Sequence, residues 1–218
     1  MTDKHRRFLG PVVEMRKLHD SAEQRIVHSA EMLDRKSLAS VGDTTGERLT
    51  ALLTETKAHT PEELAANVAR IGELLGRFAL YVPARFTDDP AEQAKYWAVR
   101  SGIFPAVGGS RPAGTTCLSE DVAFHIEDLP RATAELQALI ARHGYDACIY
   151  GHALEDNYHF IINQSFSPPA EVARYEALMN DVAELVSAGT TARSNPSMAR
   201  GATWRPSSAA SRATTPWP

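Results

Sequence analysis

The stretch Asp146-Ala-Cys-Ile-Tyr-Gly-His-Ala-Leu-Glu-Asp-Asn-Tyr-His-Phe-Ile-Ile-Asn163 decides the fold. Its two ends, 146–151 and 158–163, are rich in apolar and aromatic residues and flank a polar turn, so they predict a β-hairpin. Pairing would bring His152 and His159 together across the turn. Two converging imidazoles could hold a divalent metal with a carboxylate as third ligand. Spacing alone favours an ordinary surface pair or hydrogen-bonded polar groups.

Helices are expected before and after this hairpin in the sequence. Pro130 begins a helix that ends at about His143, before Gly144 in the position of a C-cap glycine. Thr60-Pro61-Glu62-Glu63 has the pattern of a capping box at a helix start. The remaining expected elements are helices at 9–36, 88–99 and 170–186, strands at 49–55 and 115–124, and a loop at 102–114.

This element order predicts an α+β fold. We expect a ferredoxin-like antiparallel sheet covered by helices on one face, with an N-terminal helix and an irregular C-terminal tail. The sequence shows no glycine-rich nucleotide-binding motif and no nucleophile elbow.

Composition limits the class of protein. The 218 residues are 43% hydrophobic and 23% charged, as in soluble globular proteins. The net charge of −4 gives no indication of a nucleic-acid partner. No apolar run approaches the roughly 20 residues of a membrane helix, and no signal peptide is evident. The two cysteines, Cys117 and Cys148, suit a reducing compartment, so we expect a cytoplasmic protein.

Three stretches between about Ala30 and Leu185 carry a family resemblance. They are Trp97-Ala-Val-Arg-Ser-Gly-Ile-Phe-Pro-Ala-Val-Gly108, Glu120-Asp-Val-Ala-Phe124 and Gly151-His-Ala-Leu-Glu-Asp-Asn-Tyr-His-Phe160. They resemble the C-terminal cap domain of FAD-linked oxidases, which include glycolate oxidase, D-lactate dehydrogenase and D-2-hydroxyglutarate dehydrogenase. The similarity is greatest to the large bacterial branch that also carries iron–sulfur domains. It implies an extension at 1–29, a cap domain at 30–186 and a tail at 187–218.

The resemblance implies oxidation of a D-2-hydroxy acid, with hydride passing to FAD. His152 and His159 match the family's metal-binding histidines, for an ion such as zinc or manganese, and His159 is the expected catalytic residue. Arg100 matches an arginine that binds the substrate carboxylate, a role that its fork geometry suits. Without the resemblance, Arg100 would be expected on a solvated helix face. Residues that contact FAD are not identified.

Three positions depart from the family pattern. Asp156 stands where the family usually has glycine, and Tyr158 where it usually has leucine. Ser119 occupies the place where several members carry a substrate-binding lysine, so the identity of the hydroxy acid stays open.

The composition changes abruptly after Glu184. From Leu185 to Pro218 there is no Asp, Glu or Lys. The family has a Glu-His-Gly segment here, whose glutamate is the third metal ligand. Codons can be chosen for residues 189–208 so that a shifted frame encodes YDGSLKPEHGTGRNMAPFV, which contains that segment. We therefore expect a frameshift near codons 186–189, a missing third ligand, and an irregular, out-of-frame tail at 187–218.

The expected FAD-binding domain does not fit before the cap, within residues 1–30. The leading hypothesis is a cap-domain fragment of a flavoenzyme, inactive alone, whose FAD-binding domain lies in cis or in a separate chain. Two alternatives stay open. One is a non-catalytic α+β subunit domain that partners a separately encoded flavin subunit, and the other is a stand-alone metal-binding domain.

Overall fold

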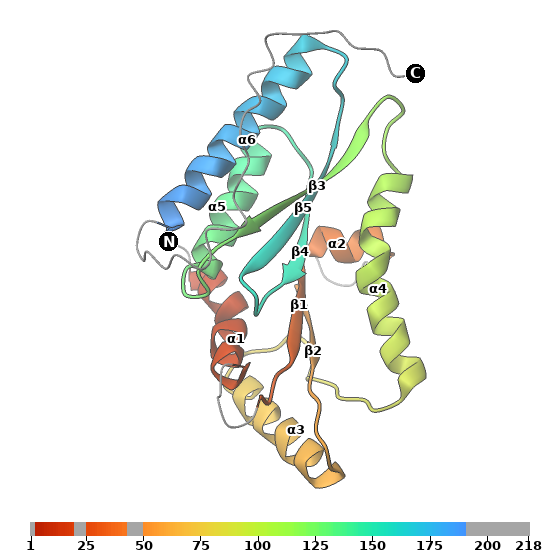
Figure 1. The fold of residues 1–218 in the computed structure, drawn as a ribbon, viewed down its shortest axis with the longest axis vertical. Helices are drawn as coiled ribbons and strands as arrows, with labels where there is room; N and C mark the ends of the chain where they lie inside the picture. The colour runs from red at the N-terminus through yellow and green to blue at the C-terminus, as the bar shows by residue number, and fades with distance from the viewer. Residues whose placement is uncertain (1–2, 20–24, 43–49, 191–218) are drawn as a thin grey trace, which may run out of the picture.

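The computed structural model describes residues 3–19, 25–42 and 50–190. One antiparallel sheet runs through the molecule in the strand order β2-β1-β4-β5-β3 (Figure 1). Its strands are β1 (Ser29–Leu33), β2 (Ala51–Glu55), β3 (Thr116–Ala123), β4 (Cys148–His152) and β5 (Asn157–Gln164). The helices are α1 (Asp3–His19), α2 (Arg35–Ser40), α3 (Pro61–Leu75), α4 (Pro90–Gly109), α5 (Leu129–Arg142) and α6 (Pro169–Thr190). The predicted α+β fold with an antiparallel sheet is confirmed.

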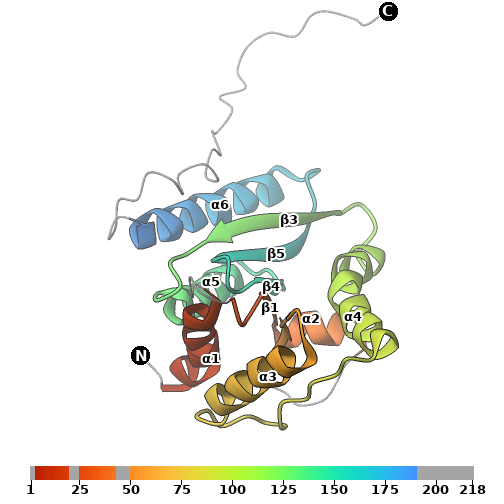
Figure 2. The same ribbon diagram turned by 60° about the horizontal axis from the view of Figure 1, so that its bottom comes forward.

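The first face of the sheet carries the main hydrophobic core. Helices α1, α5 and α6 lie over this face, and α3 packs beside α1 (Figure 2). The strands contribute alternate residues to the core, which is the period of a pleated strand. The largest fully buried side chains of this core are Met15, Met32, Ile71, Leu129, Leu136, Ile149, Leu154, Tyr158, Phe160 and Ile162.

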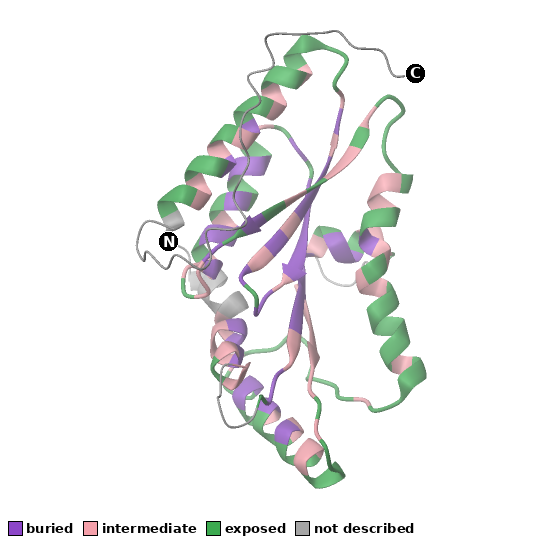
Figure 3. Ribbon diagram, viewed as in Figure 1, coloured by how far each residue is buried: buried purple, intermediate pink, exposed green. Residues whose placement is uncertain are grey.

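The second face of the sheet is also covered, but only in part. Helices α2 and α4 pack there over a smaller core of Leu33, Leu38, Ile103, Cys148, Tyr150 and Ile161. The prediction placed helices on one face only, whereas the structure has helices on both (Figure 2). Ile103 is the buried residue of α4, and most of that helix is green or pink in Figure 3. Part of the second face stays accessible beside these helices, where the side chains of Asp121 and His152 are 66% and 40% exposed.

The helix predicted over 9–36 is wrong beyond His19. Ser29–Leu33 forms strand β1, and Asp34 then caps α2 by accepting a hydrogen bond from the Ser37 amide. Ser, Ala, Glu, Met and Leu are not typical strand residues, and their helix propensity favoured the wrong element. Pairing with β2 on one side and β4 on the other overrides that preference.

The loop predicted over 102–114 is largely helical. Helix α4 continues to Gly109, through Gly102 and Pro105. Ile103 is fully buried in the smaller core, and a side chain at Gly102 would lie 3.5 Å from Val41. Packing against α2 thus extends the helix through residues that usually end one.

Other predicted elements are present. The hairpin, the strands near 50 and 120 and the helix after Pro130 agree with the structure within about two residues. Thr60 caps α3 by accepting from the Glu63 amide, while the Glu63 carboxylate accepts from the His59 amide. Helix α6 continues to Thr190, past the expected boundary at 186. The rest of the expected out-of-frame tail, 191–218, lies outside the described residues. Within the described ranges, no helix is long and apolar enough to cross a membrane.

Candidate functional site on the second face of the sheet

Strand register places a group of polar residues together on the second face. Glu31 of β1 is opposite His152 of β4, and Tyr150 of β4 is opposite His159 of β5. His159 is in turn opposite Asp121 of β3. Residues in register project from the same face of a sheet, as do residues two positions apart in one strand. Glu31 and His152 therefore lie in one row, and Tyr150, His159 and Asp121 lie in the next row on the same face.

The two histidines predicted to converge do so. Their ring centres are 5.6 Å apart and the ring planes are nearly perpendicular. Each ring has a carboxylate at Nδ1, since Glu31 Oε1 lies 2.5 Å from His152 and Asp121 contacts His159. A carboxylate only accepts, so Nδ1 carries the proton in each ring. In the neutral imidazole, Nε2 then has the free lone pair.

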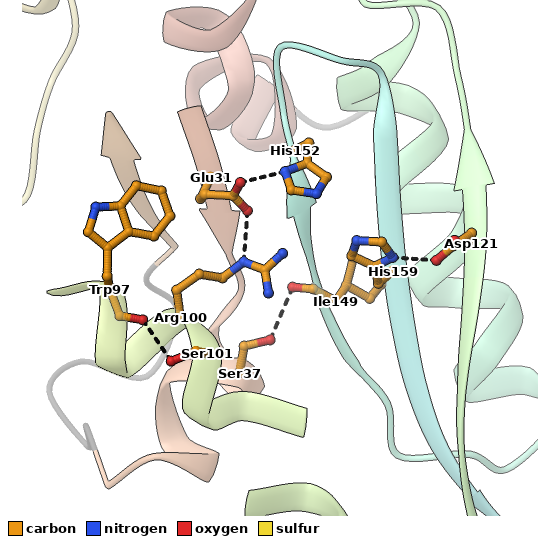
Figure 4. A network of polar contacts seen from close by, with 9 residues as sticks. All are labelled: Glu31, Ser37, Trp97, Arg100, Ser101, Asp121, Ile149, His152 and His159. Atoms are coloured by element: carbon orange, nitrogen blue, oxygen red, sulfur yellow. Dashed lines mark hydrogen bonds and ion pairs between the residues drawn. The ribbon is translucent and has the colours of Figure 1, made fainter. Parts of the chain in front are cut away.

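Arg100 reaches the same group of residues from α4. Its Nε donates to Glu31 Oε2 at 2.8 Å, and its guanidinium lies 4.6 Å from the centre of the Tyr150 ring. Figure 4 shows the guanidinium beside Glu31 and directed towards the two imidazoles. The Arg100 side chain is only 18% exposed, so it is not a solvated helix residue.

Tyr150 forms the apolar floor of this group. Tyr150 is 5% exposed and its ring centre lies 5.3 Å from that of His159. Burial raises the pKa of the Tyr150 phenol, an effect that the nearby Arg100 charge only partly opposes. The phenol is therefore neutral at physiological pH and acts as a packing surface and hydrogen-bonding group.

The hairpin has unusual backbone angles at two positions, one directly before His152 and one in the turn between the histidines. Gly151 has φ of +154°, and Asp156 has φ of +61° in the left-handed region. Asp156 occupies the position where the resemblance leads one to expect glycine. Aspartate is among the non-glycine residues that tolerate this region. Arg16 of α1 also forms an ion pair with Asp156 and donates to the Leu154 carbonyl, which ties the turn to the main core.

The cavity beside this polar group is too small to be a complete substrate pocket. A cavity of about 10 Å³ lies beside Glu31 and His152, which is room for roughly one water molecule. A larger groove, of about 430 Å³, lies elsewhere. This α1–α5 groove is lined by Gly10, Val13, Glu14, Arg77, Phe78, Glu127 and Pro130. Its residues include no histidine and belong to the layer over the first face, so we do not connect it with the imidazoles.

The two imidazoles fit half of a metal site. With metal–nitrogen bonds of about 2.1 Å and a tetrahedral angle, two ring centres around one ion would be about 5.3 Å apart. The observed separation of 5.6 Å is close to that value. Carboxylates at Nδ1 are the usual partners of metal-binding histidines. In the described part of the chain, however, no group of three or more His, Cys, Asp or Glu is arranged to hold an ion.

Sequence reasoning missed two members of the group, Glu31 and Asp121. Glu31 lay inside the wrongly predicted helix, and its 3% exposure depends on strand pairing. Asp121 belonged to a stretch that carried the family resemblance, but no role was inferred for it. Each of the two strands beside the hairpin, β1 and β3, carries one of these carboxylates. The sequence could have indicated their role only if the strand order had been predicted correctly.

A family model described as FAD linked oxidases, C-terminal domain, matches residues 15–190. Among solved structures, the isoeugenol complex of 4-ethylphenol oxidase from Gulosibacter chungangensis is similar, with 13% identity and a TM-score of 0.45. The match covers 83% of this chain and 40% of that chain, so this chain spans less than half of that oxidase. No curated protein matches. The chain belongs to the family of FAD-linked oxidases and represents their C-terminal domain.

Proposed function

We propose that this chain is the substrate-facing cap domain of an FAD-dependent oxidoreductase that oxidises a D-2-hydroxy acid. The observation that carries the proposal is the meeting of Arg100, His152 and His159 on the accessible part of the second face. A 2-hydroxy acid has a carboxylate and a hydroxyl on adjacent carbons. A guanidinium and an imidazole side by side are complementary to those two groups.

Arg100 is the group assigned to the substrate carboxylate. Its Nε is held by Glu31, and within the described residues its terminal nitrogens donate no hydrogen bond. Those two nitrogens can donate to a carboxylate as a pair. The neighbouring Tyr150 ring lowers the polarity around the guanidinium. An ion pair formed there is therefore stronger than the same ion pair in bulk water.

His159 is the residue assigned to the substrate hydroxyl. Its Nδ1 contacts Asp121, so Nε2 is the atom that can accept the hydroxyl proton. Asp121 would stabilise the imidazolium that this transfer forms. The hydrogen on the hydroxyl-bearing carbon leaves as a hydride. FAD, when bound, supplies the acceptor for it.

A divalent ion such as zinc or manganese is a further element of the proposal. His152 and His159 would hold it through Nε2, with a third ligand from outside the described residues. Since His159 Nε2 cannot bind an ion and accept a proton at once, His159 would then act on the hydroxyl as a ligand of the ion, and the direct proton transfer applies to the ion-free site. Such an ion would polarise the substrate oxygen and make the hydroxyl more acidic.

The small cavity at this face supports a partner domain. About 10 Å³ cannot enclose a hydroxy acid, so this face can contact the acid on one side only, and the FAD-binding domain, in cis or as a separate chain, would cover the other side. We place the protein in the cytoplasm, because Cys117 and Cys148 are both free thiols. Burial raises the pKa of the Cys148 thiol to about 12, which fits a structural rather than a reactive cysteine.

Calorimetric titration of the 218-residue chain with D-lactate and L-lactate, with zinc present, tests the proposal. We expect weak but saturable binding that favours the D enantiomer, because Arg100 and the imidazoles contact the acid even without the opposite wall. Arg100→Leu should weaken it at least tenfold, because the ion pair with the carboxylate is lost. Glu135→Gln on the exposed side of α5 is the matched control and should bind as the unmodified chain does. Equal, unsaturable heats for both enantiomers would refute a hydroxy-acid site and favour the non-catalytic subunit hypothesis.

A further inference from the structure

Glu31 is a buried carboxylate between two hydrogen-bond donors. Its side chain is 4% exposed, and its two oxygens have different partners. Oε2 accepts from Arg100 Nε at 2.8 Å, and Oε1 accepts from His152 Nδ1 at 2.5 Å. The three residues come from β1, α4 and β4, separated by 69 and 121 positions along the chain. Figure 4 shows Glu31 joining the arginine to the histidine.

We propose that Glu31 is a positioning residue that fixes Arg100 and His152 as one unit through the two acceptor oxygens of its carboxylate. The inference deepens the proposed function, on which its biological meaning rests. The positioning itself is a property of this chain and can be measured without substrate, metal or flavin.

The number of acceptor oxygens on Glu31 determines which tautomer His152 presents. Arginine has only donors, and it remains charged at any physiological pH. Once one Glu31 oxygen accepts from Arg100, the other is available to His152. Because that oxygen has no proton to donate, the imidazole has to present Nδ1–H. Nε2 of His152 then has its lone pair free on the accessible face.

An amide in the same position would act differently. Glutamine has nearly the shape of glutamate, but it offers one acceptor and one donor group. The charged guanidinium forms the stronger hydrogen bond and would take the oxygen. The NH₂ group would then face His152 Nδ1, which would have to accept. The proton would move to Nε2, and the lone pair on the site side would be lost.

Charge gives Glu31 a second effect at the same place. A divalent ion between the imidazoles would be close to the Arg100 guanidinium, and the two cations would repel each other. The Glu31 carboxylate offsets the arginine charge while leaving its terminal nitrogens for an anion. A merely structural ion pair would predict neither the histidine tautomer nor an effect on metal affinity.

The test is nitrogen NMR of the histidine-labelled 218-residue chain at pH 8.5, where a free imidazole is neutral. We expect His152 as the Nδ1–H tautomer in the unmodified chain and as the Nε2–H tautomer in Glu31→Gln. The double variant Glu31→Gln/Arg100→Met should restore Nδ1–H, because the amide oxygen becomes free to accept from His152. Asp181→Asn, which removes the carboxylate from His143 elsewhere, should leave His152 unchanged.

Zinc titration supplies an independent readout. Glu31→Gln should weaken zinc binding by about ten- to a hundredfold, as is typical for the outer partner of a metal-binding histidine. The proposal is overturned if His152 is Nε2–H in the unmodified chain, if a folded Glu31→Gln keeps Nδ1–H, or if the double variant fails to restore it. Should Glu31→Gln not fold, the spectrum of the unmodified chain decides. Absence of zinc binding in every variant would reject the metal part of the proposed function and leave the tautomer result standing.

Discussion

Gly151 allows the two histidine-bearing strands to pair closely at the turn. Its φ is +154°, and a Cβ at this position would lie 2.5 Å from the Asn157 carbonyl oxygen and 2.8 Å from the Tyr158 Cα. Both neighbours are backbone atoms of the paired strand, so neither can rotate away. Glycine is therefore required here by contact as well as by conformation.

We expect Gly151→Ala to lower the free energy of unfolding by about 3 kcal/mol, from backbone strain and loss of hairpin pairing. Gly144→Ala is the matched control. Gly144 has φ of +74°, but a Cβ there meets nothing within 4 Å. It should cost only about 1 kcal/mol, for the left-handed conformation alone. Urea denaturation of both variants measures the difference, and equal losses would show that the close contact with β5 has no energetic effect.

Helices α5 and α6 are linked at the surface by Asp181. Its carboxylate accepts from His143 Nε2 and from Arg142 Nη2, both at 2.8 Å. These contacts, with the His143 hydrogen bond the larger, lower the pKa of the Asp181 carboxyl below its ordinary value of 3.8. His143 and Arg142 lie 38 and 39 positions before Asp181 in the chain, so these contacts join two separate elements.

The lowered pKa gives a pH dependence with a definite sign. A carboxyl that is more acidic in the folded chain stabilises it above the unfolded pKa, and this contribution is lost as the pH falls through the folded pKa. Asp181→Asn should therefore reduce Tm at pH 5 and make little difference at pH 2. Glu135→Gln, which breaks a pair within α5 only, should change Tm less at pH 5. A Tm loss for Asp181→Asn that is as large at pH 2 as at pH 5 would contradict this mechanism.

Element prediction from the sequence succeeded where a pattern was local. The hairpin at 146–163, the cap at Thr60 and the end of α5 near Gly144 each depend on residues within a few positions of one another. It failed at β1 and in the second half of α4. Both of those elements depend on neighbours that are distant in the chain, namely β4 for Ser29–Leu33 and Val41 for Gly102.

At the scale of the whole molecule, the candidate site depends on strand order. The sequence predicted that His152 and His159 would meet, because one hairpin holds both. The resemblance supplied Arg100. Neither could supply Glu31, since nothing local places β1 next to β4. The five-residue group of Glu31, Arg100, Asp121, His152 and His159 thus becomes visible only when β1-β4-β5-β3 are assembled.

The two faces of the sheet differ in what covers them. The first face holds the main core and gives the domain its stability. The second face is apolar where α2 and α4 cover it, and its accessible part carries the Asp121 and His152 side chains. The accessible part of the second face is the substrate side that we propose, whereas the α1–α5 groove lies in the helical layer on the other side.

The most direct test of the central claim is to map D-lactate binding onto the chain with amide and side-chain NMR, with zinc present. Our description requires the shifts to concentrate at the ends of β4 and β5, at the imidazoles of His152 and His159 and at the Arg100 guanidinium. It also requires them to disappear in Arg100→Leu. Shifts confined to the α1–α5 groove, or no saturable shifts at any concentration, would contradict the assignment of the second face as the substrate side.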